Sequence, residues 1–161
     1  MRAGTGWDIH RTNPDRTLFL GGVKIPGAAG LAGHSDADVL VHAVVDALLG
    51  AAGLGDIGEH FPDTDPELAG ISGRAIASGV IALLGGAGLR IVNIDCTVVL
   101  ETPKLRPHKE AIRASLAEMF HVAIGAVNVK AKTCEGLGPV GRGEAIEARA
   151  VALVEKAKLK T

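Results

Sequence analysis

The chain has 161 residues, the length of one domain with a single hydrophobic core. It is 47% hydrophobic but only 2% aromatic and has no tyrosine, so its core must be built from Ala, Val, Leu and Ile. The formal net charge of −1 excludes the general basic field of nucleic-acid-binding proteins, so any phosphate must be bound by local groups or metal ions.

The N-terminal part is predicted to begin with two strands, over residues 1–9 and 17–25, with RTNPDR as the turn between them. After them, Ser35 and Asp38 have the spacing of a capping box in front of a run of periodic apolar residues. This pattern predicts a helix over 36–53.

The rest of the chain interleaves strands and helices. The polar segment DIGEHFPDTDPE is expected to be a loop with one helical turn, followed by a helix over 72–86. Alternating apolar residues predict strands over 90–102 and 126–133, with a helix over 106–120 between them. Residues 145–157 fit a helix or a strand equally well by pattern. This order predicts a two-layer α/β domain with helices on one face of the sheet.

The motif GWDIH holds Asp8 and His10 two positions apart. On a strand, positions i and i+2 point to one face, so both side chains can reach a metal ion, a substrate hydroxyl or water. In the predicted helix, Asp38, His42 and Asp46 are spaced by four and form a polar stripe. If that stripe faces the strand, Asp8, His10 and His42 form a set of three ligands that is typical of zinc. Three protein ligands leave the fourth coordination position of the metal open, as in catalytic sites. The D-x-H spacing is common, so a helix histidine without a metal remains an alternative.

Further segments carry groups suited to anions or metals. GHSDAD places His34 and Ser35 at a helix N-terminus, where free N–H groups favour anions. The acidic loop DIGEHFPDTD suits metal ions or sugar hydroxyls, and Lys104 with Arg106 could clamp a phosphate. A predicted strand end and a glycine-rich loop follow in the segment KAKTCEGLGPVGRGE. This segment carries four charged or hydroxyl side chains: Lys132, Thr133, Glu135 and Arg142. Taken singly, these segments are more typical of a helix cap, a solvated acidic loop and surface charges.

Together, the segments resemble the 2-C-methyl-D-erythritol 2,4-cyclodiphosphate synthases of the non-mevalonate isoprenoid pathway. The resemblance rests on GWDIH, GGVKIP, HSDADVLVHAVVDALLGAAGLGDIGEHFPDTDP, NIDCTVVLETPKLRPH and VNVKAKTCEGLGPVGRGE, in order along almost the whole chain. It implies a single domain over 1–161 that ends in a strand, and a homotrimer with active sites between neighbouring subunits. It also implies a phosphorus–oxygen lyase. The 2-phosphate of 4-diphosphocytidyl-2-C-methyl-D-erythritol 2-phosphate attacks its own β-phosphorus, closing a cyclic diphosphate and releasing CMP.

The resemblance implies two metal sites. Asp8, His10 and His42 would bind zinc or another divalent transition metal. Glu135 would help to hold magnesium or manganese, because carboxylate and phosphate oxygens suit such hard ions. Asp46 would orient one of the ligating histidines.

The resemblance also implies which residues contact the substrate, beside the metal ligands Asp8, His10 and Glu135. His34 and Thr133 match positions that stabilise the transition state. A methylerythritol group would surround one end of the substrate: Ser35, Asp56, Ile57, Gly58, Phe61, Pro62, Asp63, Thr64 and Asp65. A cytidine group would surround the other end, mostly through backbone atoms: Leu100, Pro103, Lys104, Leu105, Arg106, Ala131, Lys132 and Thr133. Cys134, Pro139 and Arg142 complete the set.

The chain departs from the family pattern at three positions. Trp7 and Pro139 stand where a phenylalanine and an aromatic residue are usual, and Lys132 stands where threonine is frequent. Family trimers have an apolar cavity on the threefold axis, in which isoprenoid diphosphates have been proposed to bind near an arginine that Arg142 matches. We expect Trp7 and Pro139 to change the shape of this cavity.

Location and alternative functions complete the sequence-based expectations. Cys96 and Cys134 form no C-x-x-C pair, and MRAGTGWDIH lacks the apolar segment of a secretory signal. No stretch has the length and hydrophobicity of a membrane span. We therefore expect a cytoplasmic protein that binds neither nucleic acid nor membrane. The alternative functions are a zinc hydrolase of nucleotide diphosphates and a catalytically idle trimer that senses nucleotides or isoprenoids.

Overall fold

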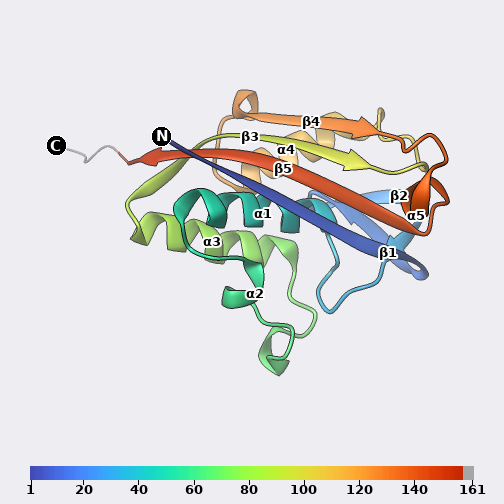
Figure 1. The fold of residues 1–161 in the computed structure, drawn as a ribbon, viewed down its shortest axis with the longest axis horizontal. Helices are drawn as coiled ribbons and strands as arrows, with labels where there is room; N and C mark the ends of the chain where they lie inside the picture. The colour runs from blue at the N-terminus through green and yellow to red at the C-terminus, as the bar shows by residue number, and fades with distance from the viewer. Residues whose placement is uncertain (158–161) are drawn as a thin grey trace.

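The computed structural model describes residues 1–157. Five strands form one mixed sheet in the order β2-β1-β5-β3-β4. Helices lie along one face of this sheet, so the chain forms two layers (Figure 1). In this sheet β3 and β4 run parallel, and the pairs β1–β2, β1–β5 and β3–β5 run antiparallel. The predicted two-layer α/β fold is confirmed. The single domain predicted over 1–161 includes residues 158–161, which lie outside the described part.

The elements occur in the following order. They are β1 (Arg2–Leu20), β2 (Val23–Leu31), α1 (Val39–Ala52), α2 (Ile57–His60), α3 (Gly73–Gly86), β3 (Leu89–Val99), α4 (Lys109–Met119), β4 (Val127–Lys132), α5 (Gly138–Gly141) and β5 (Ala145–Lys156), with short 3₁₀ helices at Pro66–Leu68 and Ile124–Ala126. The segment that its pattern left open is β5, the central strand. Every helix within residues 1–157 is too short or too polar to span a bilayer.

The N-terminal prediction of two strands joined by a turn at RTNPDR is wrong. One strand, β1, runs through this segment, and the turn lies at Gly21 and Gly22, whose φ values are 61° and 75°. Positive φ at both positions is typical of the two-residue turns that connect hairpins. Pro14 lies instead where the register of β1 with β2 shifts, between Asn13 and Thr17, so the turn-forming residues are accommodated as a bulge.

Helix α1 begins three residues later than predicted, at Val39, and its cap is Asp38. The predicted capping box is wrong, because the Asp38 carboxylate itself accepts hydrogen bonds from the N–H groups of Leu40 and Val41. Ser35 lies outside the helix, in the loop before it. The first N–H groups of the helix are therefore bonded to a buried carboxylate of the chain itself.

Helix α1 lies directly on β1 because the contact residues of the strand have no side chains. A Cβ atom built on Gly4 would overlap the carbonyl oxygen of Ala47, and one built on Gly6 would overlap that of Ala43. Only glycine permits this approach. Asp8 and His10 lie further along β1 on the same face, because side chains alternate along a strand.

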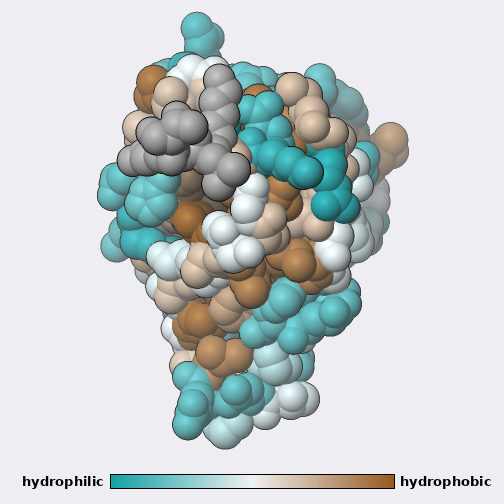
Figure 2. Space-filling view, turned by 90° about the vertical axis from the view of Figure 1, so that its left-hand side faces the viewer, coloured by the Kyte–Doolittle hydropathy of each residue, from teal (hydrophilic) through white to brown (hydrophobic). Residues whose placement is uncertain are grey.

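The opposite face of the sheet carries exposed apolar residues. Trp7 is 55% exposed, Val151 43% and Ile9 38%. Trp7 and Val151 also line a shallow cavity of about 500 Å³ on this face, together with Lys130 and Arg149. Hydrophobic residues also gather between hydrophilic ones at the end of the molecule where β3 begins and β5 ends (Figure 2). A cleft of about 290 Å³ lies there between α3, β3 and the end of α4.

We expect Gly6→Ala to lower the stability of the protein and to weaken any binding of zinc at the expected ligands Asp8, His10 and His42. The added methyl group must push α1 away from β1, which costs about 1–3 kcal/mol or more, and this displacement carries His42 away from Asp8. Gly85→Ala is the matched control, because a Cβ at Gly85 in α3 has no atom within 4 Å. Thermal unfolding and zinc titration of both variants test this, and equal behaviour of the two would contradict it.

Candidate active site

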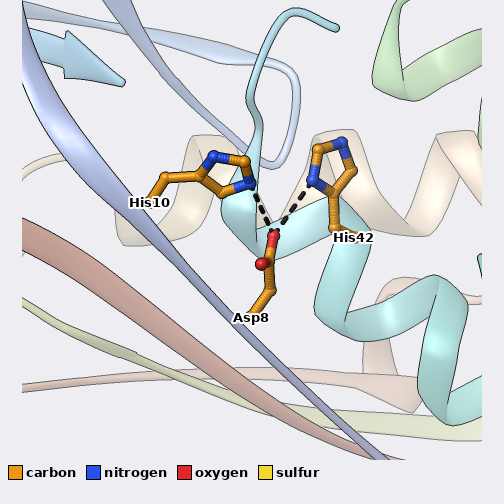
Figure 3. A group of neighbouring side chains, drawn as sticks. All are labelled: Asp8, His10 and His42. Atoms are coloured by element: carbon orange, nitrogen blue, oxygen red, sulfur yellow. Dashed lines mark hydrogen bonds and ion pairs between the residues drawn. The ribbon is translucent and has the colours of Figure 1, made fainter. Parts of the chain in front are cut away.

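Three side chains that sequence spacing indicated as metal ligands lie together at the contact between β1 and α1. Asp8 and His10 come from β1 and His42 from α1, and they point toward one another (Figure 3). The Asp8 Oδ2 atom lies 2.9 Å from His10 Nε2 and 3.0 Å from His42 Nδ1. One ligand atom of each residue lies within 4.8 Å of the other two. We call these three residues the triad.

The hydrogen bonds of His10 show that the triad suits a cation. His10 Nδ1 lies 2.6 Å from the carbonyl oxygen of Ala32, which can only accept a hydrogen bond, so Nδ1 carries a proton. In a neutral ring, Nε2 would then present a lone pair to the Asp8 carboxylate, which is also only an acceptor. A proton or a metal ion must therefore lie between these two groups.

The pKa values of the metal-free triad follow from this pairing. The hydrogen bond that His10 donates to the Asp8 carboxylate raises the pKa of His10, and burial opposes this rise. Burial alone would raise the pKa of the Asp8 carboxyl, but the hydrogen bonds and positive charges of His10 and His42 outweigh it and lower that pKa. Asp8 is therefore ionised, as a metal ligand must be.

Two loop groups fix the orientation of the histidine rings. The Ala32 carbonyl holds His10, and Ser35 Oγ lies 3.2 Å from His42 Nε2. Asp46, which we expected to orient a ligating histidine, accepts a hydrogen bond from the Ile57 N–H at 2.9 Å instead, so this expectation is wrong. Asp46 thereby ties the start of α2 to α1.

Arg16 holds the loop that carries His34 and Ser35. Its guanidinium group donates hydrogen bonds of 2.7 Å to the carbonyl oxygens of Gly33 and Ser35. Sequence analysis did not assign Arg16 a role, because it lies in the segment predicted to be a turn. The sequence held no signal for this contact, because both hydrogen-bond acceptors of Arg16 are backbone carbonyl oxygens.

A cavity of about 680 Å³ lies beside the triad. It contains the triad, His34 and nearly all of the predicted methylerythritol group: Ser35, Ile57, Gly58, Phe61, Pro62, Asp63, Thr64 and Asp65. Asp56, the remaining member of this group, is not among the described residues that line the cavity; it is the N-cap of α2 and accepts a hydrogen bond from the Glu59 N–H. The apolar walls of the cavity include Leu68, Ile71 and Ile76. Sequence analysis did not single out these three residues because their pattern is that of ordinary core residues.

The predicted cytidine group lies in another part of the chain. Residues 100–106 follow β3 and residues 131–133 end β4, and the two segments are neighbours because Leu100 N–H donates to the Lys132 carbonyl at 3.0 Å. Strands β5 and β3 separate β1 from β4, which amounts to three steps of about 4.8 Å, or roughly 14 Å. Within the described chain, the cavity beside the triad is lined by no residue of this group.

The remaining predicted residues lie near α5. Pro139 is in the first turn of this short helix, and Arg142 follows its end. The Arg142 guanidinium donates hydrogen bonds of 2.8 and 3.0 Å to the Glu144 carboxylate. Neither residue lines the cavity of the triad within the described chain.

Comparison with known sequences places the chain in a family. The profile of the YgbB family matches residues 1–155. The chain belongs to the YgbB family. This YgbB chain is 53% identical over 156 residues to the 2-C-methyl-D-erythritol 2,4-cyclodiphosphate synthase of Dechloromonas aromatica, a match that covers 97% of the chain and 98% of the relative. It is 55% identical to the enzyme of the same name from Desulfosudis oleivorans, over 96% of the chain and 92% of the relative.

Solved structures agree with this assignment. A 2C-methyl-D-erythritol-2,4-cyclodiphosphate synthase superimposes with a TM-score of 0.88 at 38% identity, covering 96% of the YgbB chain and 100% of that protein. The same score and coverage hold for a form bound to CDP. The bifunctional IspDF of Campylobacter jejuni gives a TM-score of 0.91 at 37% identity, over 96% of this chain and 42% of that one. The family resemblance seen in the sequence is confirmed.

We expect the zinc affinity of the triad to fall as the pH decreases. In the metal-free protein, Asp8 raises the pKa of His10 above its ordinary value of 6.5, so a proton competes with the metal at higher pH than on a free histidine. The loss should approach about tenfold per pH unit for each competing proton. Competition against a chelator, from pH about 8 down to about 5, measures this. An affinity that is independent of pH would contradict the expectation.

Proposed function

We propose that the chain is an enzyme that converts 4-diphosphocytidyl-2-C-methyl-D-erythritol 2-phosphate to 2-C-methyl-D-erythritol 2,4-cyclodiphosphate and CMP, in non-mevalonate isoprenoid biosynthesis. The observation that carries the proposal is the coincidence of two facts. The chain matches named synthases over nearly its whole length, and its triad lines a cavity large enough for the methylerythritol end of this substrate.

The donor sets fit the expected metals. One carboxylate and two imidazoles suit zinc or another divalent transition metal, and three protein ligands leave a position open for a substrate oxygen. The Glu135 carboxylate suits magnesium or manganese. When bound, these ions neutralise phosphate charge and polarise the β-phosphate.

The reaction needs positioning more than a protein nucleophile. An oxygen of the 2-phosphate forms a bond to the β-phosphorus, and the bond from that phosphorus to the oxygen of the α-phosphate breaks, so CMP leaves with that oxygen. The barriers are the repulsion of two anions and the entropy of bending the substrate. Binding in a near-attack geometry contributes up to roughly 7–11 kcal/mol. Ile57, Gly58 and the 61–65 segment enclose the bent methylerythritol end, while His34 and Thr133 stabilise the transition state.

The buried side chains of the cytidine group support recognition of the base by backbone atoms. Leu100 is only 3% exposed and Leu105 only 2%. Because their side chains are buried in the core, these two residues can contact a ligand only through their peptide groups. Main-chain donors and acceptors can bind the polar edge of cytosine without an aromatic clamp.

The two halves of the site meet in a homotrimer under this proposal. The cytidine group follows strands two and three steps across the sheet from β1, roughly 10 to 14 Å, and under the proposal each active site takes the two groups from neighbouring subunits. The exposed apolar residues on the open sheet face, Trp7, Ile9 and Val151, are suited to the contact between subunits. An isoprenoid diphosphate near Arg142 and a cytoplasmic location stay predictions.

Phosphorus NMR of the protein with its substrate, zinc and magnesium tests the reaction. We expect the coupled resonances of a cyclic diphosphate to appear together with CMP. His42→Ala should lower the rate at least about 100-fold because it removes a metal ligand. His121→Asn is the matched control, because His121 is exposed at the end of α4 and asparagine tolerates its φ of 53°.

Other outcomes of the NMR experiment would contradict the proposal. CMP appearing with linear phosphates only would indicate a zinc-dependent hydrolase. Protein that is folded, trimeric and loaded with zinc but gives no turnover would be a binding protein without catalysis.

Sedimentation analysis tests the assembly. Val151→Arg should convert trimers to monomers and abolish turnover while zinc stays bound, because burying an unpaired charge costs about 3–5 kcal/mol. Ala114→Arg, on the exposed side of α4, should leave the trimer intact. A Val151→Arg protein that remains trimeric would place the subunit contact elsewhere.

A further inference from the structure

We propose that Glu101 is a positioning residue that holds the turn carrying Glu135, and through it sets the magnesium requirement of the reaction. This inference rests on the proposed function. Glu101 follows the end of β3. Its Oε1 atom accepts hydrogen bonds from the N–H groups of Cys134, at 2.8 Å, and Gly136, at 3.3 Å. One carboxylate oxygen therefore binds the peptide groups on both sides of Glu135.

The turn needs such support because its backbone is strained. The Cys134 carbonyl accepts a hydrogen bond from the Leu137 N–H at 2.9 Å, which closes a four-residue turn. Its two central residues, Glu135 and Gly136, have φ values of 51° and 78°. Positive φ at both positions suits glycine, asparagine or aspartate. Glutamate is disfavoured there, because its Cβ crowds the backbone in the left-handed region.

The strained turn directs Glu135 back toward Thr133. Thr133 Oγ1 donates a hydrogen bond to Glu135 Oε1 at 2.5 Å. The residue proposed to hold magnesium is thus in contact with one proposed to stabilise the transition state. Without Glu101, two N–H groups lose their acceptor, and Glu135 can relax to a conformation that points elsewhere.

The location of Glu101 also links the turn to the nucleotide. It lies between Leu100 and Pro103, which belong to the cytidine group, and the Leu100 N–H is already bonded to the Lys132 carbonyl. The peptide segment that contacts cytidine and the turn that holds magnesium are therefore joined by a single side chain. The Oε1 atom of Glu101 is occupied by the two N–H groups, which suits it to orient a metal-binding residue rather than to bind the metal itself.

Magnesium titrations of three variants test this role. In Glu101→Ala, the magnesium concentration for half-maximal activity should rise about 10–100-fold, as is typical when an orienting partner of a metal ligand is lost. Zinc content should stay unchanged. Glu101→Gln should recover most of the loss, because its amide oxygen can still accept both hydrogen bonds. Glu101→Asp keeps the charge but is too short to reach both N–H groups, so it should resemble Glu101→Ala.

A matched control removes a carboxylate that has a hydrogen bond elsewhere on the surface. Glu118 on α4 is 73% exposed and pairs with Arg74, so Glu118→Ala should keep the magnesium requirement of the unaltered enzyme. An unchanged requirement in Glu101→Ala and Glu101→Asp would overturn the proposal. A requirement that rises equally in Glu118→Ala would do the same.

Two readouts are independent of turnover. Hydrogen exchange of the Cys134 and Gly136 amides should accelerate in Glu101→Ala but not in Glu101→Gln. Binding of Mn²⁺ in the presence of CDP, followed by electron paramagnetic resonance, should weaken in the same order. If the unaltered protein forms no cyclic product, the proposed function fails, while these two measurements still decide whether Glu101 holds the turn.

Discussion

The contact between α1 and β1 is the constraint on which the site depends. Gly4 and Gly6 allow the helix backbone to touch the strand. Asp8 lies two residues further along the same strand face, and His42 immediately precedes Ala43, whose carbonyl faces Gly6. The packing that seats the helix therefore also sets the distance between Asp8 and His42. Stability and metal geometry share one interface, so a change at the glycines must affect both.

Asp38 fixes the position of α1 along its axis. Its carboxylate is fully buried and accepts four backbone hydrogen bonds, two from the start of α1 and two from the turn at Gly21 and Gly22. Burial raises the pKa of Asp38, and these hydrogen bonds oppose that rise. Because Asp38 bonds the N–H groups of Leu40 and Val41, the proposed function assigns the phosphate groups to the metal sites and loops and not to this helix N-terminus.

Local patterns predicted the parts of this molecule that depend on periodicity. Alternation placed Asp8 and His10 on one strand face, and four-residue spacing placed His42 on a polar helix stripe, while their meeting depended on that stripe facing the strand. The helix predicted over 72–86 agrees with α3 to within one residue. The turn expected at RTNPDR failed because β1 pairs with β2 on both sides of this segment, at Thr12 and Asn13 and again from Thr17, so the turn-forming residues become a bulge within the hairpin. Arg16 and Ala32 escaped prediction because each acts through backbone carbonyls. Such contacts leave no pattern in side-chain type.

The triad and the cytidine group are separated within one chain, and this separation has a consequence for the proposed assembly. Each chain carries the triad on β1 and α1 and the Glu135 turn beyond β4, so in the proposed trimer every subunit would contribute to two active sites. Contacts of this head-to-tail kind close into a ring only at a fixed rotation. The two metal sites then approach each other only when the ring closes. Under the proposal, closure of the ring brings together the two groups that bend the substrate, so assembly and catalysis depend on the same contact.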